Sequence, residues 1–228
     1  MAIPPYGSLD QKAYEQMGLR VGLEVHQQVL TKHKLFCRCP ARCYSLDYHA
    51  EILRHMRPTL SELGEYDGTA LMEFKTKKNI VYRLHRETVC TYEMDDAPPF
   101  GLDDEALDQA LVIAIVLGCN IVGELHIARK QYLDGSIPTG FQRTTIIGTD
   151  GHLLVDGQRI GVRQLALEED ACREVSDEGH LRTYLTDRLS TPLIEVVTEP
   201  ELLSPEQAAV GAGKCRGTEP FPGQKGWE

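Results

Sequence analysis

The sequence lacks both an excess of basic residues and a long apolar run. It has 24 Lys and Arg residues against 34 Asp and Glu, which gives a formal net charge of −10 at pH 7. Because phosphate contacts need clustered positive charge, this balance argues against strong nucleic-acid binding by the isolated chain. The most apolar stretch, residues 110–119, is far too short to cross a bilayer. We therefore expect no membrane association.

Secretory signals and glycine-rich phosphate loops are also missing. Residues 1–18 mix Pro, Asp, Lys and Glu without the apolar centre of a signal peptide, so we expect a cytoplasmic protein whose seven cysteines are reduced. A P-loop is excluded, because Cys215 follows Gly213 and Lys214, and Ala208 stands where the upstream glycine is required. Any phosphate chemistry would have to rest on a bound metal ion instead of a glycine cradle.

What the chain does have is acidic residues inside three otherwise apolar, strand-like runs, residues 22–26, 167–170 and 192–195. Burying a carboxylate is costly unless it is paired or bound to a metal, so three such runs suggest a shared site. Within the first run a period of two places Glu24 and His26 on the same face. Carboxylates suit Mg²⁺ or Mn²⁺, and the imidazole slightly favours Mn²⁺. The alternative interpretation is that these are solvent-facing residues of a half-buried sheet.

The first half of the chain predicts a mixture of helices and extended segments. The clearest helix covers residues 104–117, with Asp103 as N-cap and Gly118 just beyond its end. Its second half is apolar nearly all round, which predicts burial. Two further helices are expected at residues 48–56 and 66–78, and an extended stretch at residues 79–92.

The second half predicts short strands joined by tight turns. Asp150-Gly151 and Asp156-Gly157 lie between apolar runs and indicate hairpins. Local strand pairing with helices set apart is typical of the α+β class, with a mixed, largely antiparallel sheet. The expected strands cover residues 121–130, 143–148, 153–155, 160–168, 182–187 and 193–198.

The C-terminal segment combines a signal for the start of a helix with residues that disfavour a helix. Residues 204–207 form a capping box that announces a helix, yet Gly211 and Gly213 follow within a few positions, and the rest is rich in Gly and Pro. We therefore expect an N-terminal extension over residues 1–18, a folded unit over residues 19–210 and a disordered, atypical tail over residues 211–228. A truncated or frame-shifted product is one hypothesis for this tail.

Seven further motifs occur in a fixed order along the chain, at residues 21–28, 34–37, 129–130, 140–142, 167–171, 187–189 and 192–200. Together they resemble the B and E subunits of tRNA-dependent amidotransferases. The resemblance covers nearly all of residues 19–207, and residues 57–65 and 93–99 are more similar to the archaeal E subunit than to the bacterial and organellar B subunit.

The resemblance implies a fold and a reaction. The fold would be an α+β cradle similar to the catalytic core of glutamine synthetases and guanidino kinases. The reaction would be that of a ligase, in which glutamate on tRNA(Gln) is activated by ATP at its γ-carboxylate and ammonia then displaces phosphate. Carried over by position, the resemblance makes the catalytic residues and Mg²⁺ or Mn²⁺ ligands Glu24, His26, Glu169 and Glu195.

Other residues of the resemblance have two interpretations each. Arg129 and Lys130 would meet phosphate or line the ammonia path, or else serve solubility at a strand end. Cysteines hold Zn²⁺ in some relatives, but the spacing C-x-C-x₃-C departs from the usual C-x₂-C, so free thiols remain the alternative. The cysteines in question are Cys37, Cys39, Cys43 and Cys90.

The resemblance also implies partners. Ammonia would come from a separate asparaginase-like D subunit, and Glu-tRNA(Gln) would be gripped by further domains that the relatives carry and this chain does not. A rival hypothesis is that the chain is an inactive fragment, or a module that retains the cradle fold for docking to other subunits without turnover.

Overall fold

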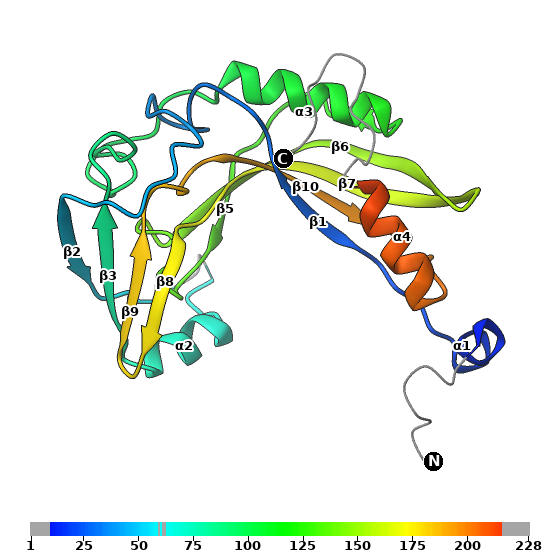
Figure 1. The fold of residues 1–228 in the computed structure, drawn as a ribbon, viewed down its shortest axis with the longest axis horizontal. Coiled ribbons are helices and arrows are strands. Elements are labelled where there is room, and N and C mark those ends of the chain that lie inside the picture. Colours follow the sequence, from blue (N-terminus) through cyan, green and yellow to red (C-terminus); the bar gives the residue numbers. More distant parts are fainter. Residues whose placement is uncertain (1–9, 59, 61–62, 216–228) are drawn as a thin grey trace.

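The computed structural model describes residues 10–58, 60 and 63–215 and has two sheets and four helices in that part of the chain. The larger sheet has the strand order β1-β10-β7-β6-β4, with β5 also paired to β6, and the smaller has the order β2-β3-β9-β8. All pairings are antiparallel except β3 with β9. The α+β class is confirmed. In Figure 1 the smaller sheet lies at one end of the larger one, and α3 runs along the outer face of the larger sheet.

The helices are α1 (Gln11–Met17), α2 (Gly68–Lys75), α3 (Asp104–Val116) and α4 (Pro205–Cys215), and none of those described is long and apolar enough to cross a membrane. The strands are β1 (Glu24–Gln28), β2 (Ala50–Arg54), β3 (Asn79–Leu84), β4 (Asn120–Ile121), β5 (Ala128–Gln131), β6 (Phe141–Val155), β7 (Gln158–Glu169), β8 (Arg173–Glu178), β9 (Leu181–Leu185) and β10 (Pro192–Thr198).

Helix α3 covers one face of the larger sheet, as its composition predicts. Asp103 caps it by accepting a hydrogen bond from the Ala106 amide, and Gly118 follows with a φ of 65°. Its fully buried alanines pack with Leu165, Leu167, Ile194 and Val196 in the main core. Because Glu195 lies between two of these core residues, its side chain must leave the sheet on the opposite face.

A two-residue turn at Asp156-Gly157 joins β6 to β7, so this predicted hairpin is confirmed. The hairpin predicted at Asp150-Gly151 is wrong, because β6 continues through it. A Cβ atom on Gly151 would lie 2.4 Å from the Cys119 Sγ and 2.8 Å from the Leu117 carbonyl oxygen. The glycine is therefore needed for close contact with the end of α3 instead of for a turn.

The predicted helix at residues 48–56 is also wrong, since this segment forms β2. Ala50 pairs with Leu84 of β3, and Ile52 packs on the core of the smaller sheet while Leu53 is exposed. A nine-residue helix has little stability of its own, so the available strand partner decides the outcome.

Strand β8 was not predicted, because an edge strand with mostly exposed polar side chains has no apolar alternation.

Helix α4 extends five residues beyond Val210, so the predicted break at Gly211 is wrong. Ser204 caps the helix, since the Gln207 backbone amide donates to the Ser204 Oγ at 3.2 Å, and the backbone amide of Leu203, one residue before the cap, donates to the Gln207 Oε1 at 2.8 Å. Gly211 is buried, and a Cβ there would lie 3.1 Å from the Leu23 Cδ1. The missing side chain lets α4 approach Leu23, just before β1, and Val155 of β6, which offsets the low helix propensity of glycine. The remainder of the expected tail and residues 1–9 of the N-terminal extension are outside the described residues, whereas residues 11–17 of that extension form α1.

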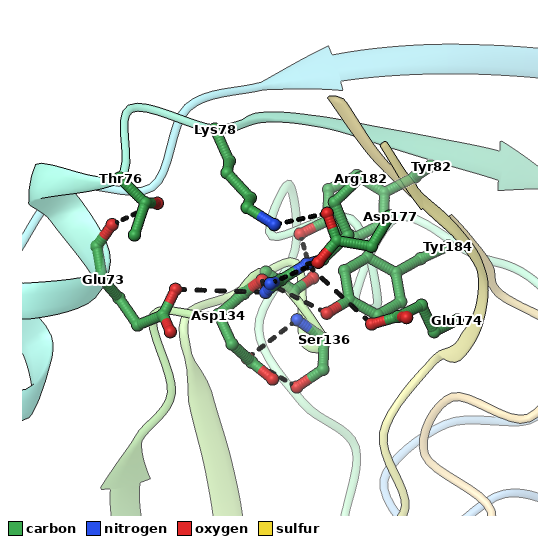
Figure 2. Close-up of polar contacts among 11 residues, drawn as sticks. Glu73, Thr76, Lys78, Tyr82, Asp134, Ser136, Glu174, Asp177, Arg182 and Tyr184 are labelled. Carbon is green, nitrogen blue, oxygen red and sulfur yellow. Dashed lines mark hydrogen bonds and ion pairs between the residues drawn. The ribbon is translucent and has the colours of Figure 1, made fainter. Parts of the chain in front are cut away.

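A polar cluster ties the smaller sheet to the loop after β5. Figure 2 shows Arg182 at its centre, with its guanidinium 2.7 Å from the Asp177 carboxylate and donating to the Asp134 carbonyl at 2.9 Å. Lys78 also donates to Asp177, and the Tyr82 hydroxyl donates to the Gly135 carbonyl at 2.6 Å. The cluster therefore fixes the loop that follows β5.

Candidate functional site

Three of the predicted site residues meet on the face of the larger sheet opposite α3. His26 of β1 pairs directly with Glu195 of β10, and Glu24 is two residues earlier on β1. The His26 Nε2 lies 3.1 Å from the Glu195 Oε2 and 3.5 Å from the Glu24 Oε1. The Glu195 side chain is only 6% exposed, whereas those of His26 and Glu24 are 45% and 60% exposed. One oxygen or nitrogen from each lies within 4.8 Å of the others, so the three can share one cation.

Glu168 and Lys130 extend this face beyond the three residues. Glu168 of β7 pairs with Leu193 of β10, which places its carboxylate on the same side as Glu195. The Lys130 ammonium donates to Glu168 and lies 3.5 Å from the Glu195 Oε2. Burial alone would lower the pKa of Lys130, but the hydrogen bond to Glu168 and the two carboxylate charges outweigh it and raise the pKa. Lys130 is thus a firmly charged ammonium beside the possible ligands.

Glu169 does not join the other three, so the prediction that all four converge is wrong for this residue. It pairs with Pro192 and therefore leaves the sheet on the α3 side. There its carboxylate accepts hydrogen bonds from the Tyr92 hydroxyl and from the Arg143 amide at 3.0 Å. Burial raises the pKa of Glu169 in spite of these donors. Its contacts are those of a buried structural carboxylate.

Arg129 and Lys130 also separate, because adjacent residues of a strand point to opposite faces. Arg129 stacks its guanidinium 5.2 Å from the centre of the Phe141 ring, and only Lys130 faces the candidate site. Gln142, which also belongs to the motifs of the resemblance, donates to the Glu169 carbonyl at 2.8 Å and is buried. Of these three residues only Lys130 is placed to meet a ligand at the site.

Polar residues that sequence analysis missed continue the same face. The Gln28 side-chain amide donates to the Asp170 Oδ2 at 2.5 Å, and the Tyr44 hydroxyl donates to the Gln28 side-chain Oε1. The Arg188 guanidinium lies 3.6 Å from Asp170. The period-two spacing of Glu24, His26 and Gln28 could have identified Gln28 from the sequence.

Three of the four predicted cysteine ligands form a second cluster. The thiols of Cys37, Cys39 and Cys90 and a carboxylate oxygen of Glu93 lie within 4.8 Å of one another. Hydrogen bonds from Cys37 and Cys39 lower the pKa of Cys90 well below its ordinary value. Cys43 is exposed, and its thiol donates to the Ala41 carbonyl at 3.7 Å, so the prediction that it joins the others is wrong for the described structure.

Comparison with known proteins decides the family. A family model described as "GatB/GatE catalytic domain" matches residues 19–218. The chain belongs to the GatB/GatE catalytic domain family. This confirms the resemblance in the motifs, and it places the candidate site, the cysteine cluster and α4 within the matched part of the chain.

Two relatives of this GatB/GatE domain have the same name. The E subunit of glutamyl-tRNA(Gln) amidotransferase from Methanococcus vannielii is 41% identical over 199 residues, which are 87% of this chain and 31% of the relative. The protein of the same name from Saccharolobus islandicus is 48% identical over 195 residues, 86% of this chain and 30% of the relative. The GatB/GatE domain described here therefore spans about a third of the length of these relatives.

Proposed function

We propose that this domain carries out the chemical step of a Glu-tRNA(Gln) amidotransferase: ATP-dependent activation of the γ-carboxylate of glutamate on tRNA(Gln), followed by attack of ammonia. The observation that carries the proposal is the meeting of Glu24, His26 and Glu195 on an accessible sheet face. Family membership supports the same assignment, because the relatives are named for this amidation.

The donor set of the site fits a divalent cation. Two carboxylates and one imidazole, all within 4.8 Å of one another, suit Mg²⁺ or Mn²⁺, with Glu24, His26 and Glu195 as the residues that would hold the ion. When bound, such an ion neutralises the charge of ATP phosphate oxygens and of the γ-phosphoryl group in transfer. The exposed carboxylate of Glu24 leaves the site open to a large nucleotide.

The chain's own residues add orientation and charge to this site. Glu168 is almost completely buried and holds the Lys130 ammonium, whose side chain is partly exposed. An ammonium in this position attracts a substrate phosphate or carboxylate to the open face beside Glu195. Asp170 and Gln28 hold each other at the other end of the face, which fixes the direction of β1.

Substrate and ammonia supply belong to a larger assembly in this proposal. A net charge of −10 repels tRNA phosphates, so tRNA binding would rest on the parts of the relatives that the chain does not span. The ammonia donor would be a separate, asparaginase-like D subunit of the amidotransferase.

Nucleotide binding by this chain tests the proposal. Isothermal titration should detect Mg²⁺–ATP binding, and Glu195→Gln should weaken it more than about tenfold because a ligand carboxylate is lost. Glu199→Gln is the matched control, since Glu199 is on the same segment but pairs with the exposed Arg163. A folded chain that binds no nucleotide would overturn the proposal and favour the inactive or docking alternative. Equal loss in both variants would also overturn it.

A further inference from the structure

We propose that Tyr44 and Tyr48 form a stacking platform for the unpaired 3′ end of the aminoacylated tRNA, with Tyr44 against its terminal base. The inference rests on the proposed function, because it assigns the part of the site that would receive the glutamyl ester. It adds two side chains from the loop before β2, which lies outside all the motifs that carry the resemblance.

The loop of residues 44–48 exposes large side chains although its backbone is held in place. Three of these side chains are between 45% and 75% exposed, those of Tyr44, Leu46 and Tyr48. Between them, the Ser45 amide donates at 3.1 Å to the Oδ2 of Asp187, which is completely buried. The Arg173 guanidinium donates to the Ser45 carbonyl at 3.3 Å. A loop held in this way presents its rings to a ligand at a small cost in conformational entropy.

Tyr44 connects this loop to the face that carries the candidate cation site. Its hydroxyl donates to the side chain of Gln28, which is on the same face of β1 as His26. Because a strand rises about 3.2–3.4 Å per residue, Gln28 lies roughly 6–7 Å from His26 along β1. An extended glutamyl group measures about 6 Å from its γ-carboxylate to the ester oxygen. With the γ-carboxylate at the cation site, the terminal nucleoside therefore begins beside Gln28, where its base can lie against the Tyr44 ring.

The direction of phosphoryl transfer favours this end of the face for the glutamyl group. The attacking carboxylate oxygen and the leaving ADP oxygen are roughly in line through the γ-phosphorus, so the two substrates approach from opposite ends. At one end the Glu24 side chain is 60% exposed and leaves room for the nucleotide. Gln28 and Tyr44 are at the other end, so the 3′ end of the tRNA enters there.

Guanidinium groups lie beside both rings, as they do in many sites for single-stranded nucleic acid. The Arg83 guanidinium lies 4.7 Å from the centre of the Tyr48 ring. Arg42 and Arg188 are near enough to Tyr44 to interact with it electrostatically. Unpaired RNA bases stack on aromatic rings and on guanidinium planes. Because such a contact depends on the faces of the rings, the net charge of −10 does not exclude it.

Fluorescence of a short RNA tests the platform without an activity assay. The probe is a single-stranded oligonucleotide that ends in CCA, with 2-aminopurine in place of the terminal adenine, because stacking quenches the fluorescence of this base. The chain should quench the probe, and Tyr44→Ala should weaken binding about tenfold. Tyr44→Phe should keep the quenching because the ring remains, and Tyr48→Ala should weaken binding without removing the quenching. Tyr66→Ala is the control, since Tyr66 is similarly exposed, at 48%, but precedes α2.

A second measurement separates the tRNA end from the base of ATP. The quenching should persist in saturating Mg²⁺–ATP, and Tyr44→Ala should leave the affinity for Mg²⁺–ATP in isothermal titration unchanged. If either expectation fails, Tyr44 belongs to the ATP site and the proposal is overturned. A folded chain that does not quench the probe, or an equal loss in Tyr66→Ala, would also overturn it, as would loss of quenching in Tyr44→Phe. Quenching that depends on Tyr44 in a chain that binds no Mg²⁺–ATP would support the platform and contradict the proposed function alone.

Discussion

Neighbouring carboxylates in one strand have different environments here. Glu168 and Glu169 are both buried, but one faces Lys130 and the candidate site while the other faces Tyr92 and Arg143 under α3. The two glutamates therefore allow a matched pair of substitutions that differ only in the face of the sheet.

Glu168→Gln should weaken Mn²⁺ binding about tenfold, whereas Glu169→Gln should leave it unchanged. In the native site the Lys130 ammonium is shared between Glu168 and Glu195. Without the first charge it would pair fully with Glu195 and compete with the metal ion. Electron paramagnetic resonance of free Mn²⁺ measures the affinity. Glu169→Gln should instead lower the free energy of unfolding by about 1–3 kcal/mol, because buried donors lose a charged acceptor. Weaker Mn²⁺ binding in Glu169→Gln alone would contradict this assignment of faces.

At the scale of elements, the smaller sheet depends on ion pairs near its edge. Lys78 and Arg182 lower the pKa of Asp177 through hydrogen bonds to its carboxylate (Figure 2). Because the folded pKa is below the ordinary value of 3.8, this carboxylate stabilises the fold above that pH, and the stabilisation is lost as the pH falls through the folded pKa. Asp177→Asn should thus be less stable than the native chain at neutral pH, and the difference should close as the pH falls below 3.8 and through the lowered pKa of the folded state. Urea unfolding at several pH values measures it, with Glu178→Gln as the control. A difference that does not vary with pH would contradict the ion-pair explanation.

Sequence analysis succeeded for elements with strong local signals and failed where a tertiary partner decides. Helix α3 was predicted closely because its cap, its apolar composition and the glycine at its end agree. Strand β2 was predicted as a helix because its pairing with β3 is not visible locally. The face of Glu169 was missed because its role was carried over from the resemblance and not read from its strand. Leu165 and Leu167 are in the main core, so a period of two puts Glu169 on the core side and Glu168 on the opposite side.

At the scale of the whole molecule, α4 joins the C-terminal end of the described chain to the core. Gly211 lies against Leu23 of the segment before β1 and against Val155 of β6. The sequence favoured a tail that packs against nothing, because the glycines concealed a close contact between helix and sheet.

Two truncated chains distinguish a helix that packs on the core from a tail that packs against nothing. A chain that ends at Val210 should be less stable than one that ends at Cys215 by about 2 kcal/mol, or about 4–8 °C in Tm, because the second half of α4 is removed. Differential scanning calorimetry of both, beside the full chain, measures the difference. Equal melting temperatures for the two truncated chains would show that residues 211–215 contribute nothing to the fold.

The pairing of β1 with β10 also sets when the candidate site comes into existence. His26 and Glu195 are 169 residues apart in the chain, whereas β6 and β7 are joined by a two-residue turn. At roughly 5–20 residues per second, a ribosome needs roughly 8–34 s to add the residues between them. Throughout that time the nascent chain carries two of the three cation ligands without Glu195, and closing so long a loop is among the slower steps of folding. Glu24, His26 and Glu195 can therefore hold a cation together only after β10 has been synthesised and has paired with β1.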